Sequence, residues 1–243
     1  MRVHHAGYSY RQLLDIWRAA ESCGLDGASL YDVVSRPAIE VWTALTALTM
    51  ATQRLLNMPL VLGLGRRHPV TLAKMAAGLD TLSGGNRLIL GLGYGGNEAD
   101  HRAYGFGWEP MSVRVPWLGE QVQIMRALWT EATVSLELEH YRLEGATGFP
   151  ALTPGGPPIL IAGRGRQYAL RGVAEHADLC NVSFDLSPDE WQQYQQVLIK
   201  HCAAAGRDPA RIGLTHNATV IVGRDRAAAE AVSYTHLTLP TIL

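Results

Sequence analysis

The stretch Leu82–Glu98 reads LSGGNRLILGLGYGGNE, and it decides the fold class. Ser83–Gly85 is typical of the end of a helix, because glycine readily adopts the left-handed backbone that terminates helices. Arg87–Gly93 is a short apolar run, which predicts a buried strand. Small residues follow at once in Gly93–Gly96. A helix, a turn, a buried strand and a glycine-rich loop in this order are typical of a β/α unit.

The same alternation extends in both directions from this stretch. We expect strands at Met1–His5, Gly27–Tyr31, Leu55–Leu62, Arg87–Gly93, Pro158–Ala162, Asp178–Val182 and Ile212–Val222. We expect helices at Ser9–Cys23, Glu40–Thr52, Pro69–Leu82, Arg114–Trp129, Gln167–His176 and Pro188–Ala205. The alternating segment Ala132–Leu143 predicts an antiparallel hairpin inserted after the fourth unit. The predicted fold class is therefore α/β, a (β/α)8 TIM barrel that is incomplete at its C-terminus, because such a barrel closes with eight strands.

Composition excludes several classes of protein. The chain has 243 residues, a net charge of −1 and scattered charges of both signs, so neither nucleic acid nor membrane is an expected partner. No signal peptide is evident, and no apolar run is long enough to cross a membrane. The three cysteines include no CxxC pair, which favours free thiols in a reducing compartment. We expect one cytoplasmic domain.

The last twelve residues, VSYTHLTLPTIL, resemble the translation of a transposon adapter used in DNA library preparation. We therefore expect residues 1–231 to be the barrel domain and 232–243 to be a non-native tail. A genuine eighth strand is the alternative interpretation of this segment.

The glycine cluster points to a functional site. Catalytic sites of β/α barrels lie at the carboxyl ends of the strands, where small residues let a planar cofactor approach the backbone. Asn97 and Glu98 offer polar contacts beside it. The spacing of Gly91, Gly93 and Gly96 also fits the GxGxxG pattern of a dinucleotide-binding fold, but that pattern normally lies in the first β/α turn. Simple tight turns are a third interpretation.

A family resemblance is carried by several segments between about Ser9 and Val222. They are LYD (Leu30–Asp32), RHPVTLAKMAAGLDTLSGGNRLILGLGYGGNE (Arg67–Glu98), AYGF (Ala103–Phe106), IMRALWTE (Ile124–Glu131), PPILIAGRG (Pro157–Gly165), AEHADLCN (Ala174–Asn181) and AAAGRDPARI (Ala203–Ile212). Together they resemble the luciferase-like flavin or F420-dependent oxidoreductases, and most closely the F420-dependent branch.

The resemblance implies a cofactor site at the strand ends. It assigns cofactor contacts to Leu60, Leu62, Gly63, Gly93, Tyr94, Gly95, Asn97, Gly163, Arg164 and Gly165. It also implies a cis peptide bond that does not precede proline, within about Pro59–Leu62. Gly163–Gly165 would hold the phosphate-bearing chain, since a glycine loop before a helix favours anions; a plain turn is the alternative.

The catalytic residues are less well indicated. Several F420-dependent relatives carry an Asp-His pair after the second strand, whereas here Asp32 is followed by Val33. We take Asp32 and His68 as candidate catalytic residues, with a strand-end cap and a packing motif as the respective alternatives. His4 and His5 lie near a strand end that would face the site. No HxxxH motif or His/carboxylate cluster in the sequence indicates a metal.

The resemblance implies hydride transfer between coenzyme F420 and a small organic substrate. One alternative is an FMN-dependent monooxygenase that uses O2. A second alternative is an inactive fragment with an unclosed barrel, because displaced strand ends misplace catalytic groups. The resemblance also implies a possible homodimer for the full-length protein.

Overall fold

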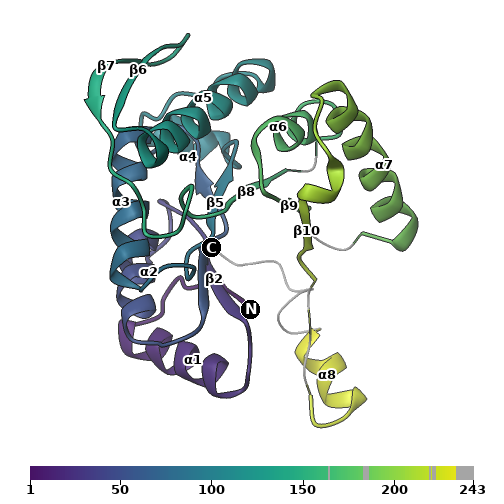
Figure 1. The fold of residues 1–243 in the computed structure, drawn as a ribbon. Coiled ribbons are helices and arrows are strands. Elements are labelled where there is room, and N and C mark those ends of the chain that lie inside the picture. The colour runs from purple at the N-terminus through teal and green to yellow at the C-terminus, as the bar shows by residue number, and fades with distance from the viewer. Residues whose placement is uncertain (164, 183–185, 219, 221–222, 234–243) are drawn as a thin grey trace.

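The computed structural model describes residues 1–163, 165–182, 186–218, 220 and 223–233 (Figure 1). Its parallel strands form two sheets. The first has the order β1 (Arg2–Val3), β2 (Gly27–Leu30) and β3 (Leu56–Pro59). The second has the order β4 (Leu62–Gly63), β5 (Leu90–Gly93), β8 (Ile159–Ala162), β9 (Leu179–Val182) and β10 (Gly213–His216). A parallel bridge between Asn57 and Leu88 joins the sheets.

The two sheets meet at an interrupted strand. Leu30 pairs with Pro59 at the end of β3, and Leu62 pairs with Leu92 at the start of β4. Between them the peptide bond Leu60–Val61 is cis. The sequence predicted one continuous strand over Leu55–Leu62, which is wrong at this bond. The implied position of a cis bond within Pro59–Leu62 is confirmed.

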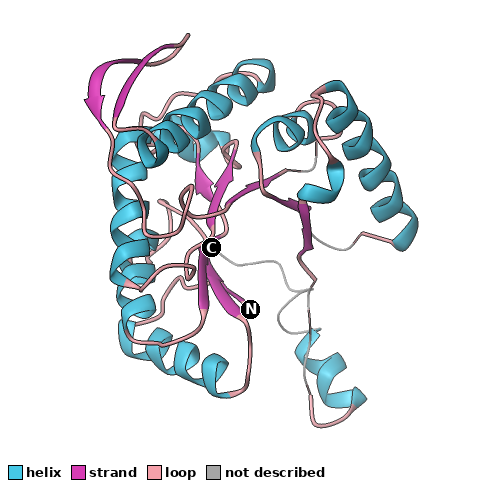
Figure 2. Cartoon of the chain, in the orientation of Figure 1, coloured by secondary structure: helices cyan, strands magenta, loops and turns pink. Residues whose placement is uncertain are grey.

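The helices lie outside the strands (Figure 2). They are α1 (Tyr10–Ser22), α2 (Val41–Met50), α3 (Pro69–Leu82), α4 (Glu98–Ala103), α5 (Met111–Thr130), α6 (Ala169–His176), α7 (Pro188–Ala204) and α8 (Arg226–Ser233). Capping boxes begin two of them, because Ser9 and Gln12 exchange hydrogen bonds at α1 and Ser187 and Glu190 do so at α7.

The core is packed between these helices and the strands. Trp17 is fully buried and its indole N–H donates to the Asn57 side chain at 2.8 Å. Asp80 is also fully buried, and it accepts hydrogen bonds from the backbone N–H and the hydroxyl of Thr153, each at 2.6 Å. Buried polar groups with partners like these fix the register of neighbouring elements.

An antiparallel hairpin follows α5. Its strands are β6 (Thr133–Glu137) and β7 (Arg142–Thr147), with a register shift between Val134 and Leu136. The hairpin rests on α5, because the Tyr141 hydroxyl accepts hydrogen bonds from Trp117 and Gln121, both at 2.8 Å. It lies at the upper left of Figure 1, away from α7.

The outer edges of β1 and β10 face each other across a cavity. Arg2 and His4 line one side of it, and Thr215 and His216 line the other; the cavity holds about 680 Å³. Within the described ranges, β10 pairs only with β9 and β1 only with β2. The strand predicted over Ile212–Val222 is seen only as Gly213–His216, and part of that prediction falls outside the described residues.

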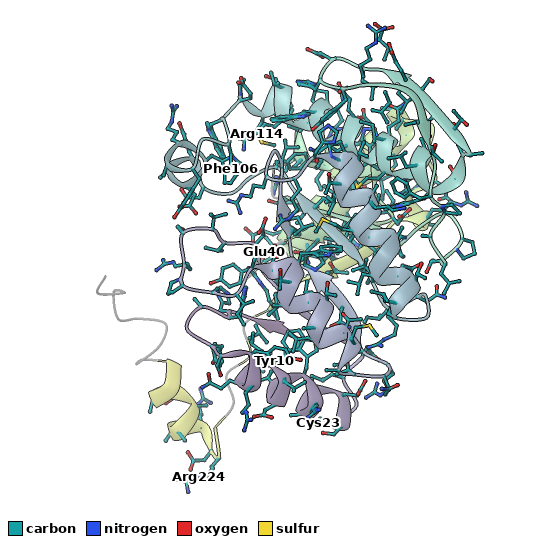
Figure 3. The ribbon with its side chains drawn as sticks, turned by 90° about the vertical axis from the view of Figure 1, so that its left-hand side faces the viewer. Tyr10, Cys23, Glu40, Phe106, Arg114 and Arg224 are labelled. Carbon is teal, nitrogen blue, oxygen red and sulfur yellow. The ribbon has the colours of Figure 1, made fainter. Side chains whose placement is uncertain are left out.

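The segment after β10 ends in α8, which lies apart from the other helices (Figures 1 and 3). The predicted tail overlaps α8 at residues 232–233, while residues 234–243 lie outside the described ones. Among the helices described, none has both the length and the hydropathy needed to cross a membrane.

Candidate functional site

A cleft of about 460 Å³ lies at the carboxyl ends of β1, β2, β4 and β5, together with the bulge between β3 and β4. This is the end of the strands where barrel enzymes place their catalytic groups. Its lining is Arg2, His4, Tyr31, Asp32, Val33, Ser35, Arg36, Leu60, Val61, Gly63, Arg66, Gly93, Gly95, Gly96, Asn97 and Asp100.

The structure brings six of the twelve predicted site residues into this cleft. They are Asp32, Leu60, Gly63, Gly93, Gly95 and Asn97. Leu62, His68, Tyr94, Gly163 and Gly165 are not part of its lining, and Arg164 lies outside the described residues.

Asp32 lines the cleft two residues after the end of β2, and its carboxylate accepts hydrogen bonds from two residues. The Arg67 guanidinium donates to Oδ2 at 2.9 Å and to Oδ1 at 3.2 Å, and the N–H of Gly63 donates to Oδ2 at 3.1 Å. Arg66 donates to the backbone carbonyl of Asp32 at 2.7 Å. These contacts favour an anchoring role, while proton transfer by Asp32 stays a prediction from the sequence.

Arg67 also pairs with Glu40 at the start of α2. Burial opposes the charge of Arg67, but the hydrogen bonds and charges of Asp32 and Glu40 raise its pKa above the usual value. Asp80 pairs instead with Thr153.

The glycines in and after β5 leave room for neighbouring parts of the chain that a side chain would displace. A Cβ at Gly91 would overlap the carbonyl oxygen of Pro59, and one at Gly93 would lie 2.5 Å from Cγ2 of Val61. A Cβ at Gly95, which has φ +84°, would lie 2.9 Å from the His101 ring. Gly91 and Gly93 therefore seat the bulge at Leu60–Val61, and Gly93 and Gly95 border the cleft.

Tyr94 and Leu62 point into the core instead of the cleft. Tyr94 is 6% exposed, and its hydroxyl donates to the carbonyl of Ala169 at 3.1 Å, so it ties the end of β5 to the start of α6. Burial raises the pKa of Tyr94 above its usual value. Leu62 is 2% exposed. Neither side chain lines the cleft, where the sequence predicted both to contact the cofactor.

His68 is the N-cap of α3. Its Nδ1 accepts a hydrogen bond from the N–H of Val70 at 3.3 Å, and Pro69 occupies the first helical position. The ring packs edge-on against Tyr141 with centroids 5.4 Å apart. The catalytic role predicted for His68 therefore receives no support from its position.

The predicted anion loop is tied to its surroundings. The N–H of Gly163 donates to the carbonyl of Asn181 at 3.2 Å, and the carbonyl of Gly165 accepts from Leu170 at 3.1 Å. A Cβ at Gly163 would lie 2.6 Å from Cβ of Ala169. Phosphate binding by this loop stays a prediction.

His4 is the imidazole that reaches the cleft. Its ring lies against Tyr31, with centroids 4.6 Å apart. Burial, followed by the charges of Arg2 and His5, lowers its pKa. His5 is 1% exposed and its Nε2 contacts the carbonyl of Ile39 at 3.0 Å, so it has a packing role.

Comparison with known proteins shows which family has this sequence pattern. A model of the luciferase-like monooxygenase family matches residues 1–241. The chain belongs to this family.

A phthiodiolone/phenolphthiodiolone dimycocerosates ketoreductase of Mycobacterium kansasii is 31% identical over 195 residues, which are 79% of this chain and 52% of the relative. An F420-dependent glucose-6-phosphate dehydrogenase of Mycolicibacterium gilvum is 29% identical over 218 residues, 83% of this chain and 62% of the relative. The chain thus spans about half to three fifths of the length of these two curated relatives.

Solved structures share the fold of this luciferase-like chain. The coenzyme F420 dependent tetrahydromethanopterin reductase of Methanopyrus kandleri has a TM-score of 0.82 at 18% identity, covering 99% of this chain and 72% of that one. A long-chain alkane monooxygenase has a TM-score of 0.79 at 17% identity, covering 92% and 60%. The predicted α/β fold class is confirmed at this level.

The sequence did not indicate five polar residues of this luciferase-like cleft. They are Arg2, Ser35, Arg36, Arg66 and Asp100. Arg2 lies in β1, Ser35 and Arg36 follow β2, and Arg66 follows β4, so closeness to strand ends is the signal that would have found them. The hydroxyl of Ser35 donates to the Asp100 carboxylate at 2.9 Å, which joins the loop after β2 to α4 at the cleft.

A second cavity of about 370 Å³ adjoins the cleft. The two share Asp32, Val33, Arg36 and Arg66. The rest of its lining is Val34, Ala38, Glu40, Val41, Arg67, Met75 and Phe106. Its wall is thus mainly apolar, with charged groups gathered where it meets the cleft.

A His/carboxylate cluster exists despite its absence from the sequence motifs. Glu120, Glu139 and His140 bring ligand atoms within 4.8 Å of one another, where α5 meets the hairpin. Glu120 already accepts from the N–H and Nδ1 of His140, at 2.9 and 3.0 Å. Trp117 stacks on the same ring. These contacts anchor the hairpin to α5. The spacing of the sequence does not reveal the cluster, because Glu120 lies on a different element from Glu139 and His140.

Proposed function

We propose that this chain is the core of an oxidoreductase that transfers a hydride between coenzyme F420 and a small organic substrate. The observation that carries the proposal is the cleft at the carboxyl ends of the strands, because five residues that the family resemblance assigns to the cofactor line it together with the candidate catalytic residue Asp32. The F420-dependent relative from Mycolicibacterium gilvum supports the same cofactor.

The residues present fit such a cofactor. A volume of about 460 Å³ lies within the range of about 300–1,000 Å³ that ligand sites occupy. Gly93, Gly95 and Gly96 present backbone without side chains to a planar ring, and Asn97 offers an amide at the cleft edge. When bound, the cofactor supplies the hydride chemistry, and the protein supplies orientation and electrostatics.

His4 is the group we propose for proton transfer at this cleft. It takes over from the histidine that is missing beside Asp32. The lowered pKa of His4 keeps the imidazole neutral near pH 7, so that it accepts a proton from a substrate hydroxyl. Its neighbour Tyr31 packs against the ring.

Cofactor titration tests the proposal. We expect F420 to bind the purified chain, read as quenching of its fluorescence. Gly96 lines the cleft, has open space around its Cα and has no positive φ, so Gly96→Phe fills the cleft without straining the backbone. It should lower F420 affinity at least tenfold, whereas Gly78→Phe on α3 should not. F420 binding that is equal in both variants would contradict the proposed site.

A second function has support from one neighbour. The fold is shared with a long-chain alkane monooxygenase, and a monooxygenase using reduced FMN and O2 fits the same cleft. Parallel titrations with F420 and FMN separate the two functions. Tight FMN binding without F420 binding would favour the monooxygenase.

The extent of the barrel bears on activity. We propose that residues 1–231 form the domain, that closing elements lie outside it, and that a longer chain is needed for full activity and for any homodimer. An inactive fragment remains the competing proposal. Comparing F420 affinity and oligomeric state of this chain with a version carrying the genomic sequence beyond Ala231 decides between them.

A further inference from the structure

The cavity beside the cleft carries an inference about the ligand. Its apolar lining includes Val34, Ala38, Val41, Met75 and Phe106. Figure 3 shows two of its residues on one face of the molecule, Glu40 at the start of α2 and Phe106 above it. Apolar walls with a few polar groups at one end are typical of pockets for small molecules.

The charges at the junction with the cleft do not cancel. The two carboxylates of Asp32 and Glu40 are engaged by Arg66 and Arg67, as the ion pairs Arg66–Asp32, Arg67–Asp32 and Arg67–Glu40. Arg36 belongs to both cavities and makes no ion pair within the described part of the chain. Among the residues that line the apolar cavity, one positive charge is therefore left over.

Arg66 gives this mouth a fixed second guanidinium. Its side chain is 7% exposed, it is held by the carbonyl of Asp32 at 2.7 Å, and its guanidinium faces the ring of Phe106 at 5.8 Å. A guanidinium that is already positioned loses little entropy when it binds an anion. Arg36 and Arg66 thus form a pair of donors at the point where polar cleft and apolar cavity join.

We infer that the apolar cavity binds a small acidic amphiphile, whose carboxylate or phosphate meets Arg36 and Arg66 and whose hydrocarbon part lies against Val34, Val41 and Phe106. The cavity of about 370 Å³ accommodates a chain of medium length or one aromatic ring. That this ligand is the substrate rests on the proposed function, because only then does the adjoining cleft hold a hydride carrier.

Three probes separate the parts of this inference. Octanoate has both an acid and a chain, octanol has only the chain and acetate has only the acid. By calorimetry the chain should bind octanoate at least tenfold more tightly than either of the others. Equal affinity for octanoate and octanol would show that the acid group is not recognised. Equal affinity for octanoate and acetate would show that the hydrocarbon chain is not recognised.

Two variants locate the site. Arg36→Gln should weaken octanoate binding five- to tenfold and leave octanol binding unchanged. Val34→Asn should weaken both. Arg11→Gln removes an exposed arginine from α1 and serves as the charge-matched control. Octanoate binding that responds equally to the Arg36 and Arg11 substitutions would overturn the assignment.

The acidic tail of the cofactor is the other source of an anion at Arg36. Val34→Asn, at a residue that lines the apolar cavity and not the cleft, should leave F420 affinity within twofold, and octanoate should still bind the F420-loaded chain. Loss of F420 affinity in this variant with unchanged octanoate affinity would overturn the inference. If F420 fails to bind while octanoate binds in an Arg36-dependent manner, the proposed function falls and the acidic ligand site stands.

Discussion

Asp32 and Arg67 form a two-point ion pair, with Oδ2–Nη1 at 2.9 Å and Oδ1–Nη2 at 3.2 Å, that joins the end of β2 to the segment before α3. The Asp32 side chain is 5% exposed, so water does little to replace Arg67 when the pair is broken. The pair lies where the cleft and the apolar cavity adjoin, since Asp32 lines both.

Asp32→Asn should therefore destabilise the protein. Removing one partner of a buried pair costs about 3–5 kcal/mol. Because Glu40 still pairs with Arg67 in this variant, we expect a loss at the lower end of that range, about 3 kcal/mol. Urea unfolding followed by circular dichroism measures the loss. Asp15→Asn, at an exposed position of α1, is the control. A stability within 0.5 kcal/mol of the wild type, roughly the level of an ordinary surface change, would show that the pair is not needed.

Gly91→Ala should also destabilise, for a steric reason. Its Cβ would overlap the carbonyl oxygen of Pro59, and such overpacking costs about 1–3 kcal/mol. Gly78→Ala is the matched comparison, because nothing lies near its Cβ and alanine favours a helix over glycine by about 0.5–1 kcal/mol. Thermal unfolding should thus shift down for the first variant and up for the second. Equal shifts would argue against close packing of the bulge on β5.

Substitutions of His68 test whether this residue caps α3 or acts in catalysis. His68→Ala removes the acceptor for the N–H of Val70 and should cost about 1 kcal/mol, which is a decrease of about 2–4 °C in Tm. His68→Asn supplies another capping acceptor and should restore most of that loss. If F420 turnover collapses in the asparagine variant although Tm is preserved, His68 is catalytic after all.

The cysteines predict a pattern of thiol reactivity. Cys23 is exposed, while Cys180 and Cys202 are buried. Burial raises the pKa of Cys180 to about 12, so its reactive thiolate is scarce at pH 8. Ellman's reagent should modify one thiol in the folded chain and three in denaturant. Rapid reaction of a second thiol without denaturant would show that the layer over β9 opens readily.

His176 predicts a dependence of stability on pH. Burial lowers its pKa, Glu175 partly opposes this, and Arg207, Arg126 and Arg171 lower it further. The unfolded chain then binds a proton more readily than the folded one, so stability falls as pH drops from the unfolded value near 6.5 to the folded pKa. Below the folded pKa this contribution falls no further.

His176→Gln checks this dependence. The free energy of unfolding, measured by urea titration between pH 7.5 and 5, should decline less steeply in the variant than in the wild type. His201→Gln, on α7, provides a comparison for a partly exposed ring. Identical slopes in the wild type and His176→Gln would contradict the assignment.

The sequence by itself determined the order of the elements and the end of the strands that carries the site. Apolar runs that alternate with helical periodicity require parallel strands covered by helices, because each must bury its apolar face. The helix at Pro69–Leu82 has the predicted bounds. Gly63, Gly93 and Asn97 follow or end strands, so their place at the cleft follows from topology alone.

Only the tertiary structure decided which side chains meet. Arg36 and Arg66 come from different loops, and only the folded chain brings both to the junction of the two cavities. Tyr94 sits among site residues in the sequence, but its bulk is buried and its hydroxyl reaches Ala169, 75 positions away. Periodicity reports which face of one element is apolar, whereas contacts between loops depend on packing over the whole chain, so the cleft's charge pattern had to be read from the fold.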